Sequence, residues 1–96
     1  MKLFRWAPAK SERLRLERGV SFEEIEVAIE QGCLLDVVAH TNHIRYPNQR
    51  IFVVRLLDYV YLVPFVEEQS SYFLKTIIPS RKATRMYLGV DDAKEE

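Results

Sequence analysis

The sequence of 96 residues has little of what builds disulfide scaffolds, linkers and membrane spans. Its single cysteine, Cys33, excludes an intramolecular disulfide and a cysteine-built metal site. Three glycines and four prolines are too few for a low-complexity or collagen-like chain. The longest apolar run, Tyr59 to Val66, contains Pro64 and is far shorter than the ~20 residues of a membrane helix. No apolar segment typical of a signal peptide follows Lys2, so we expect a cytoplasmic protein without a membrane partner.

The charged residues are balanced in number but separated along the chain. Fourteen Lys and Arg residues match fourteen Asp and Glu residues, so the formal net charge is zero. Residues 1–18 carry six bases and two acids, residues 19–36 carry five acids and no base, and residues 72–88 carry four bases and no acid. Such separation predicts one basic and one acidic face. The alternative is that the first two helices pair their opposite charges with each other across solvent.

Start and stop signals predict three helices. Pro8 is a favoured first helical residue. Ser21 and Glu24 have the spacing of a capping box, which starts a second helix that Gly32 closes. Ser80 suits the N-cap of a short third helix. The predicted helices span residues 8–18, 22–31 and 81–88.

Between the second and third helices the pattern changes to runs rich in Val, Leu, Ile and aromatic residues, which are typical of strands. The predicted strands span residues 33–39, 51–57, 59–66 and 72–78. This order predicts an α+β fold with two N-terminal helices, a four-stranded antiparallel meander with the helices on one face, and a short C-terminal helix. We expect a single domain over residues 1–90, followed by a flexible acidic tail over 91–96.

One face of this sheet is expected to stay open. The purely apolar sets of alternate residues most simply meet the helices, which leaves a mixed basic and aromatic set for the other face. A local bulge is expected at Pro64, because proline is avoided in central strands. The expected members of the open face are Arg55, Tyr59, Tyr61, Phe73 and Lys75.

Three short motifs, in this order, resemble one known family. The first is Phe4-x-Trp6 followed by Lys10, and the second is Gly-Val-Ser-Phe-Glu-Glu over residues 19–24. The third is Ser-Arg-Lys-Ala-Thr over residues 80–84, which follows a predicted strand and precedes Tyr87. Motifs and element order together resemble the BrnT family of type II toxins, small ribonucleases with a RelE-like fold. The residue after Trp6 is alanine where that family usually has aspartate, so the chain resembles a divergent member.

The resemblance implies the toxin component of a type II toxin-antitoxin system. Its implied activity is a metal-independent endoribonuclease that cleaves mRNA and needs no cofactor. Its implied partner is a cognate antitoxin with a ribbon-helix-helix DNA-binding part. The candidate catalytic residues are Lys75, Arg55, Arg81 and His43. The candidate RNA-binding residues are Arg85, Tyr61 and Tyr87.

Each candidate has a chemical reason. Cleavage through the 2′-OH needs proton transfer and stabilisation of the phosphorane charge, which Lys and Arg supply as phosphate clamps. Tyrosine rings can stack on bases. His40 and His43 alone have ordinary pKa values near neutrality, so either can serve as acid or base, or both can be polar loop residues. A metal site from Asp36, His40 and His43 is not expected, because nothing fixes its geometry.

A second function is consistent with the same residues. The chain has only two histidines and no recognisable acid-base pair. A non-catalytic RelE-like binding module that acts through a protein partner or RNA is therefore the alternative to the nuclease. A homodimer is left open by the sequence.

Overall fold

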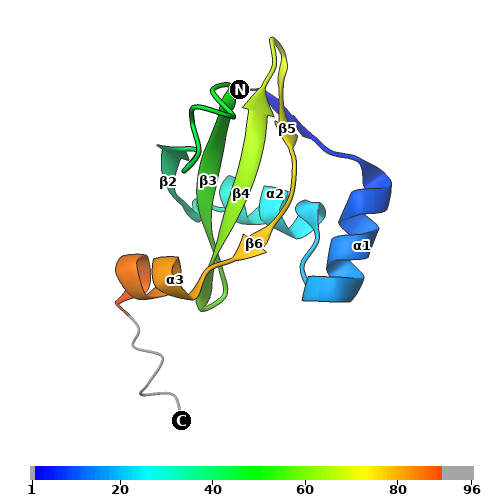
Figure 1. Ribbon diagram of the computed structural model, residues 1–96. Helices are drawn as coiled ribbons and strands as arrows, with labels where there is room; N and C mark the ends of the chain where they lie inside the picture. Colours follow the sequence, from blue (N-terminus) through cyan, green and yellow to red (C-terminus); the bar gives the residue numbers. More distant parts are fainter. Residues whose placement is uncertain (1, 90–96) are drawn as a thin grey trace.

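The computed structural model describes residues 2–89, and in this range an α+β fold is formed by helices on both sides of a mixed sheet (Figure 1). None of the helices in this range is long and apolar enough to cross a membrane. The predicted acidic tail, residues 91–96, lies outside the described residues. In chain order the elements are β1 (Leu3–Arg5), α1 (Pro8–Arg18), α2 (Phe22–Glu30), β2 (Leu34–Ala39), β3 (Gln49–Leu56), β4 (Tyr59–Glu67), β5 (Ser71–Leu74), β6 (Ile78–Pro79) and α3 (Arg81–Leu88).

The helix ends follow the sequence signals. Pro8 is the first residue of α1, which ends at Gly19 with φ of 74°, a left-handed conformation that glycine adopts without steric cost. The capping box of α2 is confirmed: the Ser21 N–H donates to Glu24 Oε1 at 2.9 Å, and the Glu24 N–H donates to Ser21 Oγ at 3.3 Å. Ser80 caps α3 by accepting the Ala83 N–H at 3.0 Å.

The predicted meander is confirmed by three antiparallel pairs, β2 with β3, β3 with β4, and β4 with β5. The sheet order is β1-β5-β4-β3-β2, with β6 paired to β4. The predicted strand count is wrong in two respects. An additional strand, β1, runs parallel to β5, and its three residues are too few to reveal an alternating pattern. The predicted strand over 72–78 divides into β5 and β6.

The predicted bulge at Pro64 is also wrong. Pro64 pairs with Ile51 in a continuous register, and the break lies in the neighbouring strand instead, between β5 and β6. The Pro64 carbonyl accepts the Lys75 N–H at 2.8 Å at this break. A proline, which has no N–H to donate, is tolerated where the partner strand is interrupted. The sheet's register shift lies in β2, between Leu34 and Asp36.

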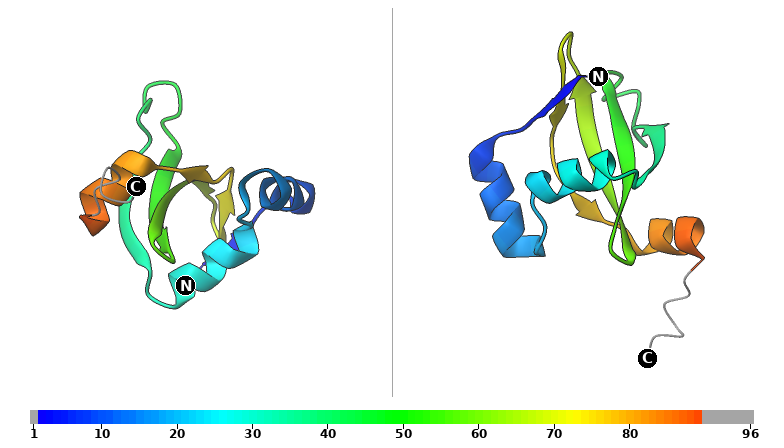
Figure 2. Two further views of the ribbon diagram at one scale, coloured as in Figure 1. Left: turned by 90° about the horizontal axis from the view of Figure 1, so that it is seen from below. Right: turned by 180° about the vertical axis from the view of Figure 1, so that it is seen from behind.

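Helices cover both faces of the sheet, so the prediction of a single covered face is wrong. Figure 2 shows α2 on one side of the strands and α3 on the other. The α2 side holds the larger core, with α1 contributing Leu14. The α3 side holds a second cluster in which Ala83 packs with Val53 and Val60. The buried members of the larger core are Leu14, Val20, Phe22, Ile25, Ala28, Phe52, Val54, Val63, Phe65, Leu74 and Ile77.

Thr84 fixes α3 to the sheet. Its hydroxyl donates to the Ser80 carbonyl at 2.8 Å and accepts the Val60 N–H at 2.9 Å, and its side chain is 1 % exposed. Thr84→Val keeps the shape but leaves a buried N–H without an acceptor. We expect the free energy of unfolding in urea to fall by about 1–3 kcal/mol.

Thr84→Ser is the matched control, because it keeps the hydroxyl and loses only a methyl group. It is expected to cost about 1 kcal/mol or less and to unfold at a higher urea concentration than Thr84→Val. Equal midpoints for the two variants would contradict the role of the hydroxyl.

Candidate nucleic-acid interface

The exposed side of α3 carries a row of cations at one end of the sheet. The chain enters α3 from β6, and the Ser80 N–H donates to the Val60 carbonyl of β4 at 3.0 Å. Ala83 and Thr84 face the sheet and are buried, so the opposite side of the helix faces solvent. The exposed cationic residues of α3 are Arg81, Lys82 and Arg85.

Arg55 lies at the same end of the sheet as α3 and on the same face. It lies directly opposite Val60 in the β3–β4 pair, and Val60 is the residue that both Ser80 and Thr84 bond. Cross-strand partners project to the same face, so Arg55 projects to the side that α3 covers. The Arg55 side chain is exposed, and its Nε donates to the Leu57 carbonyl at 2.9 Å.

Tyr87 links the C-terminal half of α3 to β2. Its hydroxyl donates to Asp36 Oδ2 at 2.9 Å. The hydrogen bond to the Asp36 carboxylate, with smaller contributions from burial and from the carboxylate charge, raises the pKa of Tyr87 above its ordinary value. Tyr87 therefore keeps its proton at neutral pH, and its exposed ring suits stacking rather than proton abstraction.

Lys75 shares this face but lies further along it. Its Nζ lies 5.4 Å from the centre of the Phe73 ring, and its N–H donates to the Pro64 carbonyl. Arg55 lies opposite Val60 of β4, and Lys75 lies beside Pro64 of the same strand. Arg55 and Lys75 are therefore separated by four residues along β4, or about 13 Å. This separation spans about two phosphates of an extended strand rather than one.

Tyr61 does not join this group. It pairs with Val54 and packs against the larger core on the α2 side, so it lies on the opposite face from Arg55. Burial is the largest cause that raises the pKa of Tyr61. Placing Tyr59 and Tyr61 beside Arg55 is wrong, because the register sets Arg55 opposite Val60 rather than opposite a tyrosine.

His43 lies at the other end of the sheet. It is exposed in the turn that connects β2 to β3, near Gln49, whereas Arg55 lies near the opposite end of β3. Figure 1 shows this turn and α3 at opposite ends of the strands. Arg50 lies at the end of β3 that follows this turn, and it is about 17 Å from Arg55 along the strand. His43 therefore cannot act on a phosphate held by Arg55 and α3.

Asp36, His40 and His43, which the sequence offered as metal ligands, do not form a cluster. Among residues 2–89, no three His, Cys, Asp or Glu side chains gather as metal ligands. Asp36 is bonded by Tyr87 and by the Val37 N–H, and His40 Nδ1 accepts the Asn42 N–H at 3.0 Å.

Two contributors were missed by the sequence reasoning. Lys82 lies inside the acid-free segment and was not singled out, although its place between Arg81 and the buried Ala83 puts it on the exposed side of a helix. Asp36 was considered only as a metal ligand. Its contact with Tyr87 joins residues 51 apart in the sequence, and no local pattern signals it.

Comparisons with protein-family models, with curated proteins and with solved structures find no match. The chemistry of this surface therefore has to be argued from its own residues. Arg55, Arg81, Lys82 and Arg85 are suited to bind phosphates and to stabilise negative charge. The chain's two histidines, His40 and His43, lie at or beyond the far end of β2, so this surface has no group whose ordinary pKa is near neutrality.

The contact between Tyr87 and Asp36 gives a test of this geometry. Asp36→Asn removes the carboxylate that raises the pKa of Tyr87, so that pKa should fall toward its ordinary value of 10.0. NMR titration of the tyrosine rings measures it, with the Tyr87 signals assigned by Tyr87→Phe. Asp58→Asn at the β3–β4 turn is the control and should leave the titration unchanged. An unshifted Tyr87 in Asp36→Asn would exclude the contact in solution.

Proposed function

We propose that this protein is the toxin component of a type II toxin-antitoxin system and that it cuts mRNA without a metal ion. The observation that carries the proposal is the gathering of Arg55 and the cations of α3 on one face at one end of the sheet. The three motifs and the order of the helices and the antiparallel meander support the kinship with BrnT-like toxins. The proposed partner is an antitoxin with a ribbon-helix-helix DNA-binding part.

The surface suits a single RNA strand better than a small anion. Its cations are spread along α3 and β3, so they match successive phosphates rather than one. Tyr87, held in place by Asp36, offers an exposed ring on the same surface. Base stacking on an aromatic side chain contributes about 1–3 kcal/mol and tolerates any sequence.

Positioning and charge stabilisation are the means by which these residues would act. Cations that hold successive phosphates restrict the RNA strand between them to a few orientations, including the one in which a 2′-OH lies in line with the leaving oxygen. Arginine stays protonated throughout and stabilises the charge of the phosphorane. The proton of the 2′-OH passes to solvent water in this scheme, and solvent water protonates the 5′-oxygen as its bond to phosphorus breaks, because His43 is too distant to exchange either proton.

The second candidate is a binding module that holds RNA without cutting it. The position of His43 favours it, because the surface then has cations and a ring but no acid-base group. Such a protein would act by occupying RNA or through its partner. Cleavage therefore separates the two candidates, and binding does not.

Expression of the chain without a partner tests the nuclease. We expect growth arrest, and we expect the purified protein to cut RNA in the presence of EDTA. Arg55→Ala combined with Lys82→Ala should reduce cleavage at least about tenfold, because two phosphate contacts are lost. Lys10→Ala combined with Arg13→Ala is the matched control, because it removes the same charge from α1.

Normal growth together with intact RNA would exclude the nuclease. Bound but uncut RNA would select the binding module. Cleavage that both double variants reduce equally would mean that overall charge, and not the α3 surface, is responsible.

The number of phosphate contacts is measured by the salt dependence of RNA binding. Lys82→Gln should weaken binding of different single-stranded RNAs to a similar extent and reduce the slope of log affinity against log salt by about 0.7. His43→Gln should leave the slope unchanged, because His43 lies at the far end of the sheet. A loss of affinity restricted to one RNA sequence would argue for base recognition by this helix instead.

A further inference from the structure

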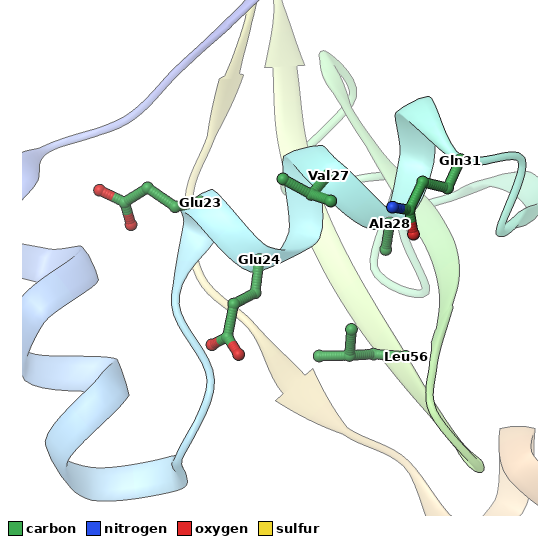
Figure 3. Close-up of a pocket in the computed structure, with 6 residues that line it drawn as sticks. All are labelled: Glu23, Glu24, Val27, Ala28, Gln31 and Leu56. Carbon is green, nitrogen blue, oxygen red and sulfur yellow. The ribbon is translucent and has the colours of Figure 1, made fainter.

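An open groove lies on the opposite face of the sheet from the cationic surface, between α2 and the end of β3. Its volume is about 270 Å³. Figure 3 shows Ala28 of α2 directed toward Leu56 of β3, with Glu24 and Gln31 on either side of Ala28 and Glu23 directed toward α1. The residues that line it are Glu23, Glu24, Val27, Ala28, Gln31 and Leu56.

The floor of this groove is apolar and incompletely covered. Ala28 is buried against the larger core, Leu56 is half-buried, and Val27 is 49 % exposed. Val27 and Leu56 together expose apolar surface that is removed from water only when another molecule covers it.

The rim is acidic. Arg15 of α1 attracts Glu24, but its close ion pair is with Glu12 and not with a rim carboxylate. The ion pairs formed within residues 2–89 involve Glu12, Glu67 and Glu68, and none involves Glu23 or Glu24. Glu23 accepts a hydrogen bond from Ser11 Oγ at 2.7 Å, and Oε1 of Glu24 serves in the capping box. The donors of both bonds are neutral groups.

The rest of α2 adds to the negative potential. Glu26 and Glu30 lie on the same helix, which contains no base. Burial, followed by repulsion from Glu30 and Glu23, raises the pKa of Glu26. The repulsion among these side chains is a cost that a cationic neighbour would remove.

The size and shape of the groove favour a protein segment. Pockets for small molecules are mostly enclosed, whereas this one lies open along a helix. The lining extends from Glu23 to Gln31, eight residues or about 12 Å along α2, which matches two turns of a second helix. Antiparallel or crossed helices place an apolar side chain in such a groove every three or four residues.

We propose that this groove binds a cationic amphipathic helix of a partner protein, whose aliphatic side chains contact Val27, Ala28 and Leu56 and whose Lys or Arg side chains pair with Glu23 and Glu24. The acidic rim favours a partner with positive charge, and the apolar floor, two helical turns long, favours a partner that is helical. The proposal does not depend on RNA binding, because the cationic surface lies on the other face of the sheet.

The test uses a synthetic peptide of about 14 residues with leucines at helical spacing and lysines beside them. Titration against the full-length protein, followed by NMR, should give saturable binding with a Kd below about 100 μM. The amide signals that shift should be those of α2 and of the residues around Leu56. A peptide with glutamates in place of the lysines, and one with serines in place of the leucines, are the controls and should not bind.

Variants of the protein separate charge from structure. Glu23→Gln combined with Glu24→Gln removes both rim charges but keeps acceptors for Ser11 and Ser21, since Gln also serves in a capping box. It should weaken peptide binding about threefold to tenfold. Glu26→Gln is the matched control, because Glu26 lies on the flank of α2 away from the groove. The peptide affinity of Glu26→Gln should stay within about twofold of the unchanged protein. Attraction between the peptide and a carboxylate outside the groove acts over a longer distance and is screened by salt.

Val27→Asp tests the apolar floor, and its exposure makes loss of the fold no concern. It should weaken binding at least about tenfold. The proposal is overturned if the lysine peptide does not bind at about 1 mM, if its shifts map to α3, or if the glutamate peptide binds equally well. Self-association of the free protein that Val27→Asp abolishes would also overturn it, because the occupant would then be a second copy.

Discussion

The pairing of β3 with β4 is the constraint on which the rest of the molecule depends. These two strands stay in register from Gln49 opposite Val66 to Leu56 opposite Tyr59, and every other side chain of the pair goes to the same face. The pair thereby sends Val54 and Tyr61 to α2, and Val53 and Val60 to α3. A shift of one residue would exchange the two cores, so burial on both faces fixes the register.

The same register separates the two charged surfaces. The acids of α2 and the bases of α3 come from segments about 60 residues apart, and the sheet lies between them. Opposite charges held apart in this way do not neutralise each other across a shared solvent gap. The zero net charge of the chain gives no hint of either surface.

The sequence predicted what depends on local chemistry and missed what depends on long-range pairing. The capping box at Ser21 and the end of α1 at Gly19 are local, and both were predicted correctly. The face of Tyr61 and the distance of His43 depend on which residue of β4 lies opposite Arg55. The placement of α3 on the second face depends on Thr84, whose hydroxyl bonds a residue 24 positions away. No alternation within one strand contains that information.

The two outer strands of the sheet make further growth of the sheet unfavourable. On one side β1 offers only three residues, too short a template for another strand. On the other side, the register shift between Leu34 and Asp36 bends β2. The bend disturbs the backbone hydrogen-bonding groups that an additional strand would need. A short edge strand and a shifted edge strand both oppose edge-to-edge pairing of sheets, although β2 exposes Leu35 and Val37.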